Sequence, residues 1–197
     1  VMAIKSDITV VGSTTYISLI TNDVLMSQFL RTDDTTFDAT LVASLWASAC
    51  EQVENYTGCV LRPSTLTMYW DELPQNSILK LPHFPITAIT SISTKVSSDS
   101  YTVYSSANYT TDLTKDARVK FITDPDYTSD YLNAVKLIAT VGYATAAVIP
   151  QQLIGAALML CGHLYNNREA VVTGTISTEL PLGIKFMLDP LRHSTQL

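Results

Sequence analysis

The spacing of apolar residues changes twice along the chain and separates helical ends from a β-rich middle. Apolar positions recur every three to four residues over 37–56 and again over 151–169, which predicts two long helices. Between Arg62 and Tyr143 apolar and polar residues alternate instead, as half-buried strands require. We therefore predict an α+β fold, with helices in the N-terminal and C-terminal parts packed with a central, mainly antiparallel β region.

Capping residues set the expected helix boundaries in the N-terminal part. A short helix is predicted to run to about Arg31, and a longer one over 37–56 after Thr35 or Thr36, with Gly58 as its C-terminal stop. Asp33 and Asp34 directly precede the longer helix, where acidic side chains complement the helix dipole, so capping is favoured over a metal site. One stripe of this helix is expected to face the core: Phe37, Leu41, Leu45, Ala49, Val53 and Tyr56.

Alternation in the middle of the chain predicts strands at Thr65–Asp71, Ile78–Leu81, Ile86–Lys95, Tyr101–Tyr104, Val119–Ile122 and Ala134–Gly142. The last is the most continuously apolar, so we expect it to be the most central. Val1–Ser18 is β-prone and is predicted to form an arm or edge hairpin of two extended pieces. The polar stretch 105–115 is predicted to be a loop, and the group Lys115, Arg118 and Lys120 a solvated strand edge or turn.

The C-terminal helix is apolar over an unusually wide arc. Leu153, Ala157, Leu160 and Leu164 define one face, and a second apolar face adjoins it, which indicates burial from more than one side. Gly155 and Gly162 share a third face, where each costs about 1 kcal/mol relative to Ala. We expect another element, such as one from a neighbouring subunit, to approach the helix closely there.

Composition favours a protein that assembles with other subunits. The 197 residues suffice for one domain, and the charged fraction is 15% with 47% apolar residues, so Ser, Thr, Tyr and Asn must build much of the surface. The net charge of −6 and the scattered basic residues argue against neutralisation of DNA phosphates as the main role. The three cysteines have no CxxC spacing, so core packing in a reducing compartment is expected.

Candidate catalytic groups have simpler structural interpretations. Glu51 and Glu54 are expected on a solvated helix face, and His163 is expected to be a satisfied core or interface histidine. Asp124, Asp126 and Asp130 have the charge of a calcium loop but neither its invariant Gly nor its terminal Glu, which favours a turn. No nucleophile elbow, P-loop or dinucleotide-binding glycine pattern is present. We expect no enzymatic activity, no metal and no cofactor.

Five short motifs occur in an order that is typical of one family. They are Val53-Glu54-Asn55-Tyr56-Thr57-Gly58, Val141-Gly142-Tyr143 with Ile149-Pro150, the apolar helix ending in His163-Leu164-Tyr165-Asn166-Asn167-Arg168-Glu169, Leu180-Pro181-Leu182-Gly183, and Leu188-Asp189-Pro190-Leu191-Arg192. In this order and spacing the chain resembles the head–tail connector (adaptor) proteins of tailed bacteriophages over 19–192. The first 18 residues and the β-rich middle match only in general character.

The resemblance implies a structural virion protein of the neck, assembled in the host cytoplasm. Such proteins form a ring, usually of twelve subunits, below the portal protein, extend the channel for double-stranded DNA without reading its sequence, and provide the docking platform for stopper or tail-completion proteins. We expect a single connector domain over 1–197, with an N-terminal arm (1–18), an α+β body (19–173) and a C-terminal docking segment (174–197) on a flexible link, and no membrane contact. The residues expected to pack helices and form the ring are Leu45, Tyr56, Leu153, Leu160, Leu164 and Tyr165; those expected to dock on the portal or another partner are Leu180, Pro181, Leu182, Gly183, Leu188, Leu191 and Arg192.

Three alternatives stay open. Another neck ring component, such as a stopper or tail-completion protein, would share the same interaction class. A metal-dependent hydrolase or nuclease would need acids such as Asp124 and Asp126 to bind metal. A DNA-binding regulator would show steeply salt-dependent binding to duplex DNA.

Overall fold

The computed structural model describes residues 4–10, 16–20, 39–97, 100–114, 116–128, 130–167 and 182–192. These residues gather in two compact units, which we call the β unit and the helical unit. The β unit comprises the first strand and Arg62–Gly142, and the helical unit comprises the described parts of Thr14–Leu61 and Tyr143–Arg192. The α+β prediction is confirmed, and the expectation of one connector domain stays a prediction.

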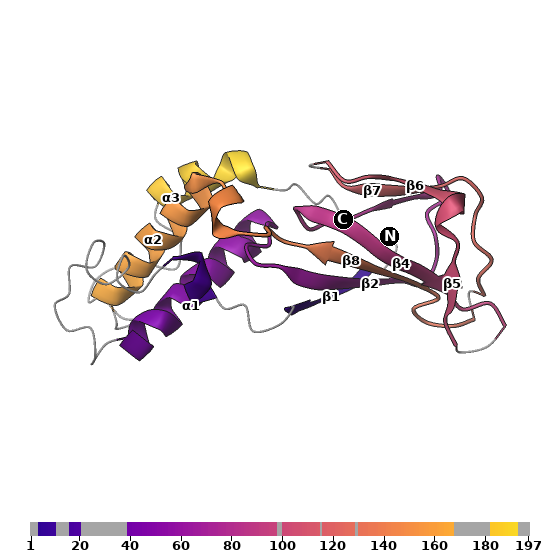
Figure 1. Cartoon of the computed structure of the whole chain (residues 1–197), viewed down its shortest axis with the longest axis horizontal. Helices are drawn as coiled ribbons and strands as arrows, with labels where there is room; N and C mark the ends of the chain where they lie inside the picture. The colour runs from indigo at the N-terminus through magenta and orange to yellow at the C-terminus, as the bar shows by residue number, and fades with distance from the viewer. Residues whose placement is uncertain are drawn as a thin grey trace. The chain divides into compact units, whose positions relative to one another are not determined.

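In the described part of the β unit, five strands form one antiparallel sheet in the order β1-β2-β8-β4-β5 (Figure 1). They are β1 (Ile4–Val10), β2 (Ser64–Trp70), β4 (Ile86–Thr94), β5 (Thr102–Tyr104) and β8 (Val135–Val141). The middle strand is β8, which confirms that the most continuously apolar segment is the most central. The register places Leu66 opposite Ala139 and Met68 opposite Leu137, so these buried side chains share one face of the sheet.

The remaining described strands form a second antiparallel sheet in the order β3-β7-β6. They are β3 (Ile78–Lys80), β6 (Tyr109–Asp112) and β7 (Arg118–Phe121), with a short 3-10 helix, η3 (Ser106–Asn108), before β6. β6 corrects the prediction of a loop over 105–115. Thr110 and Thr111 are both exposed, so this strand shows no apolar alternation, and only its pairing with β7 identifies it.

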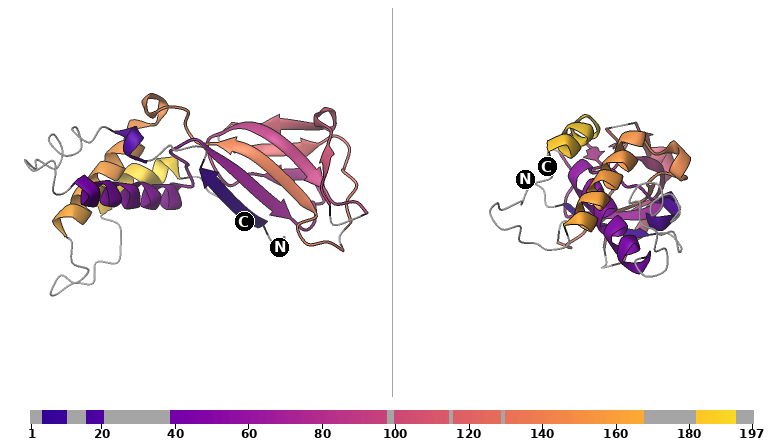
Figure 2. Two further views of the ribbon diagram at one scale, coloured as in Figure 1. Left: turned by 60° about the horizontal axis from the view of Figure 1, so that its bottom comes forward. Right: turned by 90° about the vertical axis from the view of Figure 1, so that its left-hand side faces the viewer.

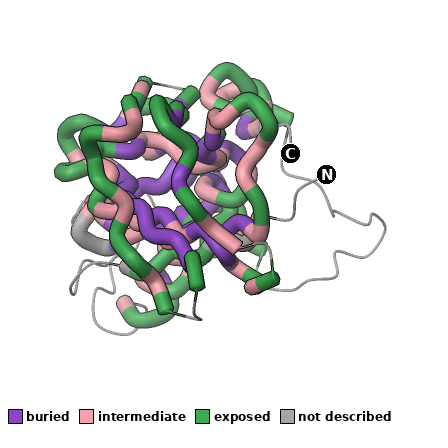
Figure 3. Tube along the Cα trace, turned by 90° about the vertical axis from the view of Figure 1, so that its right-hand side faces the viewer, coloured by how far each residue is buried: buried purple, intermediate pink, exposed green. Residues whose placement is uncertain are grey.

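The two sheets enclose the core of the β unit. The three-stranded sheet lies over one face of the five-stranded sheet (Figures 1 and 2), and Figure 3 shows the buried backbone segments between exposed ones. Leu79 and Val119 come from one sheet, and Met68 and Leu137 from the other; all four are fully buried. Each such side chain contributes about 1.5–3 kcal/mol through burial, so this layer accounts for much of the unit's stability.

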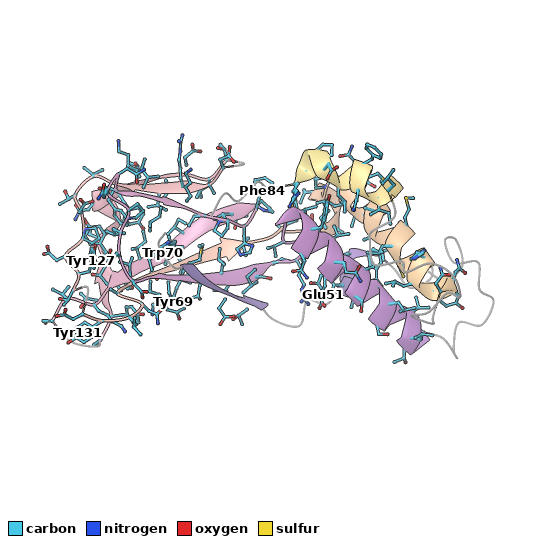
Figure 4. The ribbon with its side chains drawn as sticks, turned by 180° about the vertical axis from the view of Figure 1, so that it is seen from behind. Glu51, Tyr69, Trp70, Phe84, Tyr127 and Tyr131 are labelled. Atoms are coloured by element: carbon cyan, nitrogen blue, oxygen red, sulfur yellow. The ribbon has the colours of Figure 1, made fainter. Side chains whose placement is uncertain are left out.

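Aromatic residues gather at one end of the β unit. Figure 4 shows Tyr127 and Tyr131 at the end where β2 finishes at Trp70. The Tyr127 hydroxyl accepts a hydrogen bond from the Leu73 N–H at 3.2 Å. Between the sheets, the ring of Tyr104 stands edge-on to Phe121 with the centroids 5.9 Å apart. The first contact joins two loops at this end, and the second joins one sheet to the other.

Three helices dominate the described part of the helical unit. They are α1 (Ala39–Thr57), α2 (Gln151–Asn166) and α3 (Leu182–Leu188), with the 3-10 helices η1 (Tyr16–Leu19), η4 (Ala146–Val148) and η5 (Asp189–Leu191). α1 packs against α2, and α2 against α3. Gly58 ends α1 as predicted: its φ is +74° and its N–H bonds to Glu54 O at 2.8 Å. Pro150 directly precedes α2, where the lack of an N–H costs nothing.

The buried stripe of α1 differs from the predicted one. The buried residues are Val42, Trp46, Ala49, Cys50, Val53 and Thr57, whereas Leu41 is exposed and Leu45 and Tyr56 are half-buried. The stripe is rotated because Trp46, 0% exposed, occupies the centre of the contact and its indole N–H donates to Tyr16 O at 2.8 Å. The prediction of a helix was thus correct, but the prediction of which face is buried was wrong. Phe37 lies outside the described residues.

The N-terminal part also differs from expectation. β1 is an edge strand, but it pairs with β2 rather than with a second strand in the first 18 residues. The prediction of a second extended piece is wrong, because Tyr16–Leu19 is a 3-10 helix. The short helix expected to end near Arg31 and the caps Thr35 and Thr36 lie outside the described residues.

Candidate functional site

A part-buried hydrogen-bond network fixes the start of the helical unit against α1. Glu54 Oε2 accepts from the Tyr16 hydroxyl at 2.5 Å, and Glu54 Oε1 accepts from the Leu61 N–H at 2.7 Å. The prediction of a solvated face is therefore wrong for Glu54, and it is correct for Glu51, which is exposed on α1 (Figure 4). The half-buried Glu54 carboxylate, with its two donors, therefore holds the chain segments that precede and follow α1.

The close approach expected at the glycines of α2 is made at Gly155 by the chain's own α3. A Cβ added at Gly155 would lie 3.2 Å from Met187 Cε, so the glycine leaves room for this side chain. On α3, Ile184 and Leu188 are buried, which fixes the inward face of this short helix. The docking segment thus packs on α2 of the same chain through one face.

Polar contacts then fasten η5 to the end of α1. The Tyr56 hydroxyl donates to Asp189 Oδ1 at 2.6 Å, and the Arg192 guanidinium lies 5.3 Å from the centroid of the Tyr56 ring. Cys59 Sγ approaches Leu191 O at 3.7 Å. Two predicted groups, the packing residue Tyr56 and the docking residues Leu191 and Arg192, therefore meet in one place.

The outward face of α3 is apolar and uncovered in the single chain. Leu182 is 69% exposed, and Phe186, one helical turn further on, is 71% exposed. Leu182 belongs to the predicted docking residues, whereas Phe186 was not predicted. The four-residue spacing of Leu182 and Phe186 would have indicated that Phe186 shares a face with Leu182. That inference requires a helix at 182–188, and no helix was predicted there. Leu180 and Pro181 lie outside the described residues, and Gly183 is exposed on α3.

The residues predicted to pack helices and form the ring divide by burial. Leu153 and Leu160 are buried inside the helical unit, at 0% and 3% exposure. Leu45, Leu164 and Tyr165 are half-buried and sit on α1 and the last turn of α2. Leu153 and Leu160 are therefore core residues of the single chain. The role of the whole set in ring formation stays a prediction.

His163 is exposed on α2, which corrects the expectation of a core histidine. Its Nδ1 lies 3.3 Å from Asn167 Nδ2, and its carbonyl accepts from both the backbone N–H and the side chain of Asn167 at 3.0 Å. These bonds close the C-terminal turn of the helix. An interface role for His163 stays a prediction.

Burial shifts the pKa of two groups in the helical unit, Cys161 and Tyr143. Burial raises the pKa of the Cys161 thiol to about 11, so this cysteine is inert at neutral pH. Burial, with a smaller contribution from Cys59, raises the pKa of Tyr143 to about 12. In the described ranges no three His, Cys, Asp or Glu side chains gather as metal ligands would, and no helix there has the length and apolar content to cross a bilayer.

The basic group of the β unit is arranged differently from the prediction. Arg118 and Lys120 lie on β7, the middle strand of the three-stranded sheet, and not at an edge or in a turn. Lys80 joins them from β3, because the register places Lys80 opposite Arg118. Lys115 lies outside the described residues. The sequence could not show this cluster, since 38 positions separate Lys80 from Arg118.

Three solved structures share the fold over nearly the whole chain. A chain in the neck of an empty gene transfer agent particle, computed with C6 symmetry, has a TM-score of 0.75 and 17% identity, and the match covers 97% of both chains. A chain of the native gene transfer agent virion has a TM-score of 0.77 and 16% identity over 96% of this chain and 97% of that one. A chain in the neck of the native particle, computed with C12 symmetry, has a TM-score of 0.68 and 16% identity over 97% of both.

No family model and no curated protein matches the sequence. At 16–17% identity the similarity to the gene transfer agent chains is one of fold. It extends through both the β unit and the helical unit, because the matches cover 96–97% of the chain.

Proposed function

We propose that this chain is a structural neck protein of a tailed, phage-like particle and that it acts there as a head-to-tail adaptor. The observation that carries the proposal is the shared fold with chains of gene transfer agent necks over 97% of both chains. The order of short motifs along the chain supports the same assignment. In this role the protein is a building block without enzymatic activity or cofactor.

The adaptor forms a ring, of twelve subunits, below the portal protein in the virion neck after assembly in the host cytoplasm. The C6 and C12 symmetries of the similar neck structures support a cyclic arrangement. Low charge density and half-buried Leu45, Leu164 and Tyr165 suit packing between subunits. The ring surrounds the DNA channel and offers a platform to stopper or tail-completion proteins.

The outward face of α3 docks on the portal protein. Leu182 and Phe186 are exposed at 69% and 71%, while the opposite face of α3 is committed to the helical unit. Large exposed apolar side chains on an otherwise packed helix mark interaction sites. The predicted docking residues Leu188 and Leu191 act differently in this arrangement, because they hold α3 and η5 on the helical unit.

Mass measurement and electron microscopy test the proposal, on the purified protein alone and mixed with the portal protein of the same particle. The expected result is a closed ring with a central hole that binds portal. A stable monomer that does not bind portal would refute it. Competition binding between portal and tail proteins separates the adaptor from a stopper or tail-completion ring, because only an adaptor binds portal directly.

A further inference from the structure

The outward face of the three-stranded sheet carries a cluster of positive charge on an acidic protein. Pairing of β3 with β7 puts Lys80 opposite Arg118, and pairing of β6 with β7 puts Thr110 opposite Lys120. Directly paired residues share a face, and Val119 between them points to the core. Lys80, Arg118, Lys120 and Thr110 are therefore on one face, and all four are exposed. We call these four residues the basic face.

Little within the described chain neutralises the basic face. Asp112, opposite Arg118, is the acid on this face, and its Oδ2 accepts from Arg118 Nη2 at 3.1 Å. Its Oδ1 accepts from the Thr114 hydroxyl at 2.8 Å and from the Thr114 N–H at 3.2 Å. These two bonds, and then Arg118, lower the pKa of Asp112, which keeps it ionised. Among the described residues neither Lys80 nor Lys120 has an ion pair, so two positive charges stand uncompensated.

Two other lysines among the described residues of the β unit are engaged by the fold. Lys136 Nζ lies 4.2 Å from the centroid of the Tyr101 ring, and Lys95 Nζ donates to Leu132 O at 3.0 Å. Like charges on neighbouring strands repel one another, and side chains two positions apart along a strand are about 7 Å apart. Repulsion among these charges therefore destabilises the basic face in the isolated chain, and an anionic partner would remove this repulsion.

The chemistry of the basic face favours a nucleic-acid backbone over a protein surface. Protein interfaces are centred on buried aromatic or aliphatic anchors, whereas the paired strands give this face one apolar residue, the half-buried Ile78, and Ile122 is exposed just past the end of β7. Phosphate oxygens take Lys and Arg together with the hydroxyl of Ser or Thr, which Thr110 supplies. The face is composed of side chains that bind phosphate without reading bases.

We propose that the basic face, through Lys80, Arg118, Lys120 and Thr110, contacts the phosphate backbone of double-stranded DNA without sequence preference, and so is the side of the subunit turned toward the channel. This assignment of the channel side rests on the proposed function. The contact is weak in each subunit, because the protein carries a net charge of −6 and three cations make few phosphate contacts. A weak, repeated contact lets DNA pass while it is centred.

The test is fluorescence anisotropy of the full-length protein with a labelled 30-base-pair duplex of random sequence, from 20 to 200 mM NaCl. With a slope of about −0.9 per phosphate contact, three contacts lower the affinity about 40-fold between 50 and 200 mM salt. In K80Q/K120Q, which leaves the Arg118–Asp112 pair intact, one contact remains and the loss falls to about 3-fold. The control K136Q/K185Q removes the same charge elsewhere and should keep the wild-type slope. D112N removes the acid from the basic face and should bind more tightly than wild type.

Each other outcome is decisive. If wild-type protein binds no duplex at 20 mM salt, or if both double variants weaken binding equally, the proposal is overturned. If K80Q/K120Q loses ring assembly or portal binding and keeps its DNA affinity, the basic face serves an acidic protein surface and the proposal is again overturned. A monomer whose DNA binding still depends on Lys80 and Lys120 would refute the adaptor function and leave the DNA contact standing.

Discussion

Tyr56 and Asp189, 133 positions apart, are joined by a hydrogen bond of 2.6 Å from the phenol to the carboxylate. The bond connects the end of α1 to the 3-10 helix that follows α3. It raises the pKa of Tyr56, chiefly because the neutral phenol is the donor and an anion beside Asp189 is disfavoured. The C-terminal segment is thus held on the helical unit by a contact that requires a protonated tyrosine.

Replacing Tyr56 by Phe should loosen α3 and η5 without unfolding α1. Hydrogen–deuterium exchange of 182–192 at pH 7 is expected to be faster in Y56F than in wild type, with 42–53 unchanged. Because the folded-state pKa of Tyr56 lies above its ordinary value of 10.0, the bond is fully present below pH 10 and is lost as pH rises beyond it. Wild-type exchange should therefore approach that of Y56F above pH 10, after correction for intrinsic rates. Equal protection of this segment in both proteins at pH 7 would contradict the prediction.

The Glu54 carboxylate should contribute measurably to stability. Glu54→Ala removes the acceptor of the Leu61 N–H and of the Tyr16 hydroxyl, and bonds to a charged group are worth about 1.5–3 kcal/mol each. We expect the free energy of unfolding in urea to fall by about 2–4 kcal/mol. Glu51→Ala, on the exposed side of the same helix, is the matched control and should stay within about 0.5 kcal/mol of wild type. Similar values for the two variants would show that the network is unimportant.

Sequence periodicity identified most of the fold because buried elements leave a regular trace. The positions of α1 and α2 and most strands could be predicted from apolar spacing, and the stop at Gly58 from its conformational freedom. The phase of α1 could not, because Trp46 and Leu45 are both apolar and the partner of the buried Trp46 indole, the Tyr16 carbonyl, lies 30 positions away in the sequence. β6 was not predicted, because a strand exposed on both faces shows no alternation of apolar and polar residues.

The candidate site was predictable only where the residues are local. Leu182 was named from its motif, but Phe186 and Lys80 were not, since their importance comes from which face of α3 is covered and from the pairing of β3 with β7. Glu54 was misassigned because its donors, Tyr16 and Leu61, are brought to it by the fold. Long-range pairing is the part of the structure that this single sequence did not reveal.

Gly142 should tolerate no side chain, whereas Gly183 should tolerate one. Gly142 has φ +100°, and a Cβ there would lie 2.0 Å from Arg62 O, a backbone atom that cannot move away. Gly142→Ala should destabilise the protein by at least about 3 kcal/mol through strain and steric overlap. At Gly183, where nothing lies within 4 Å of an added Cβ, Ala should stabilise α3 by up to about 1 kcal/mol. Thermal unfolding measures both, and a stable Gly142→Ala variant would exclude this backbone conformation.

Tyr143 should make the protein sensitive to alkaline pH. Burial raises its pKa from 10.0 to about 12, so the folded chain holds this proton more tightly than the unfolded chain does. The corresponding stability is fully present below pH 10 and is lost as pH rises from 10 to 12. Y143F lacks the group, so the difference in unfolding free energy between wild type and Y143F should shift in favour of Y143F from pH 8 to pH 11. A pH-independent difference in urea denaturation would show that Tyr143 titrates normally.

Substitution of buried and of exposed apolar side chains in the helical unit should have different effects. Leu153 is 0% exposed, so Leu153→Ala creates a cavity and should cost about 2–5 kcal/mol of unfolding free energy. Leu182 and Phe186 are 69% and 71% exposed, so L182A/F186A should stay within about 1 kcal/mol of wild type. If α3 docks on the portal protein, the double variant should form the wild-type ring by native mass spectrometry and bind portal at least about 10-fold more weakly, since anchors of this kind are worth over 1 kcal/mol each. A variant that keeps portal affinity but loses the ring would place this apolar face between neighbouring subunits, and one that keeps both would leave it without a role in the neck.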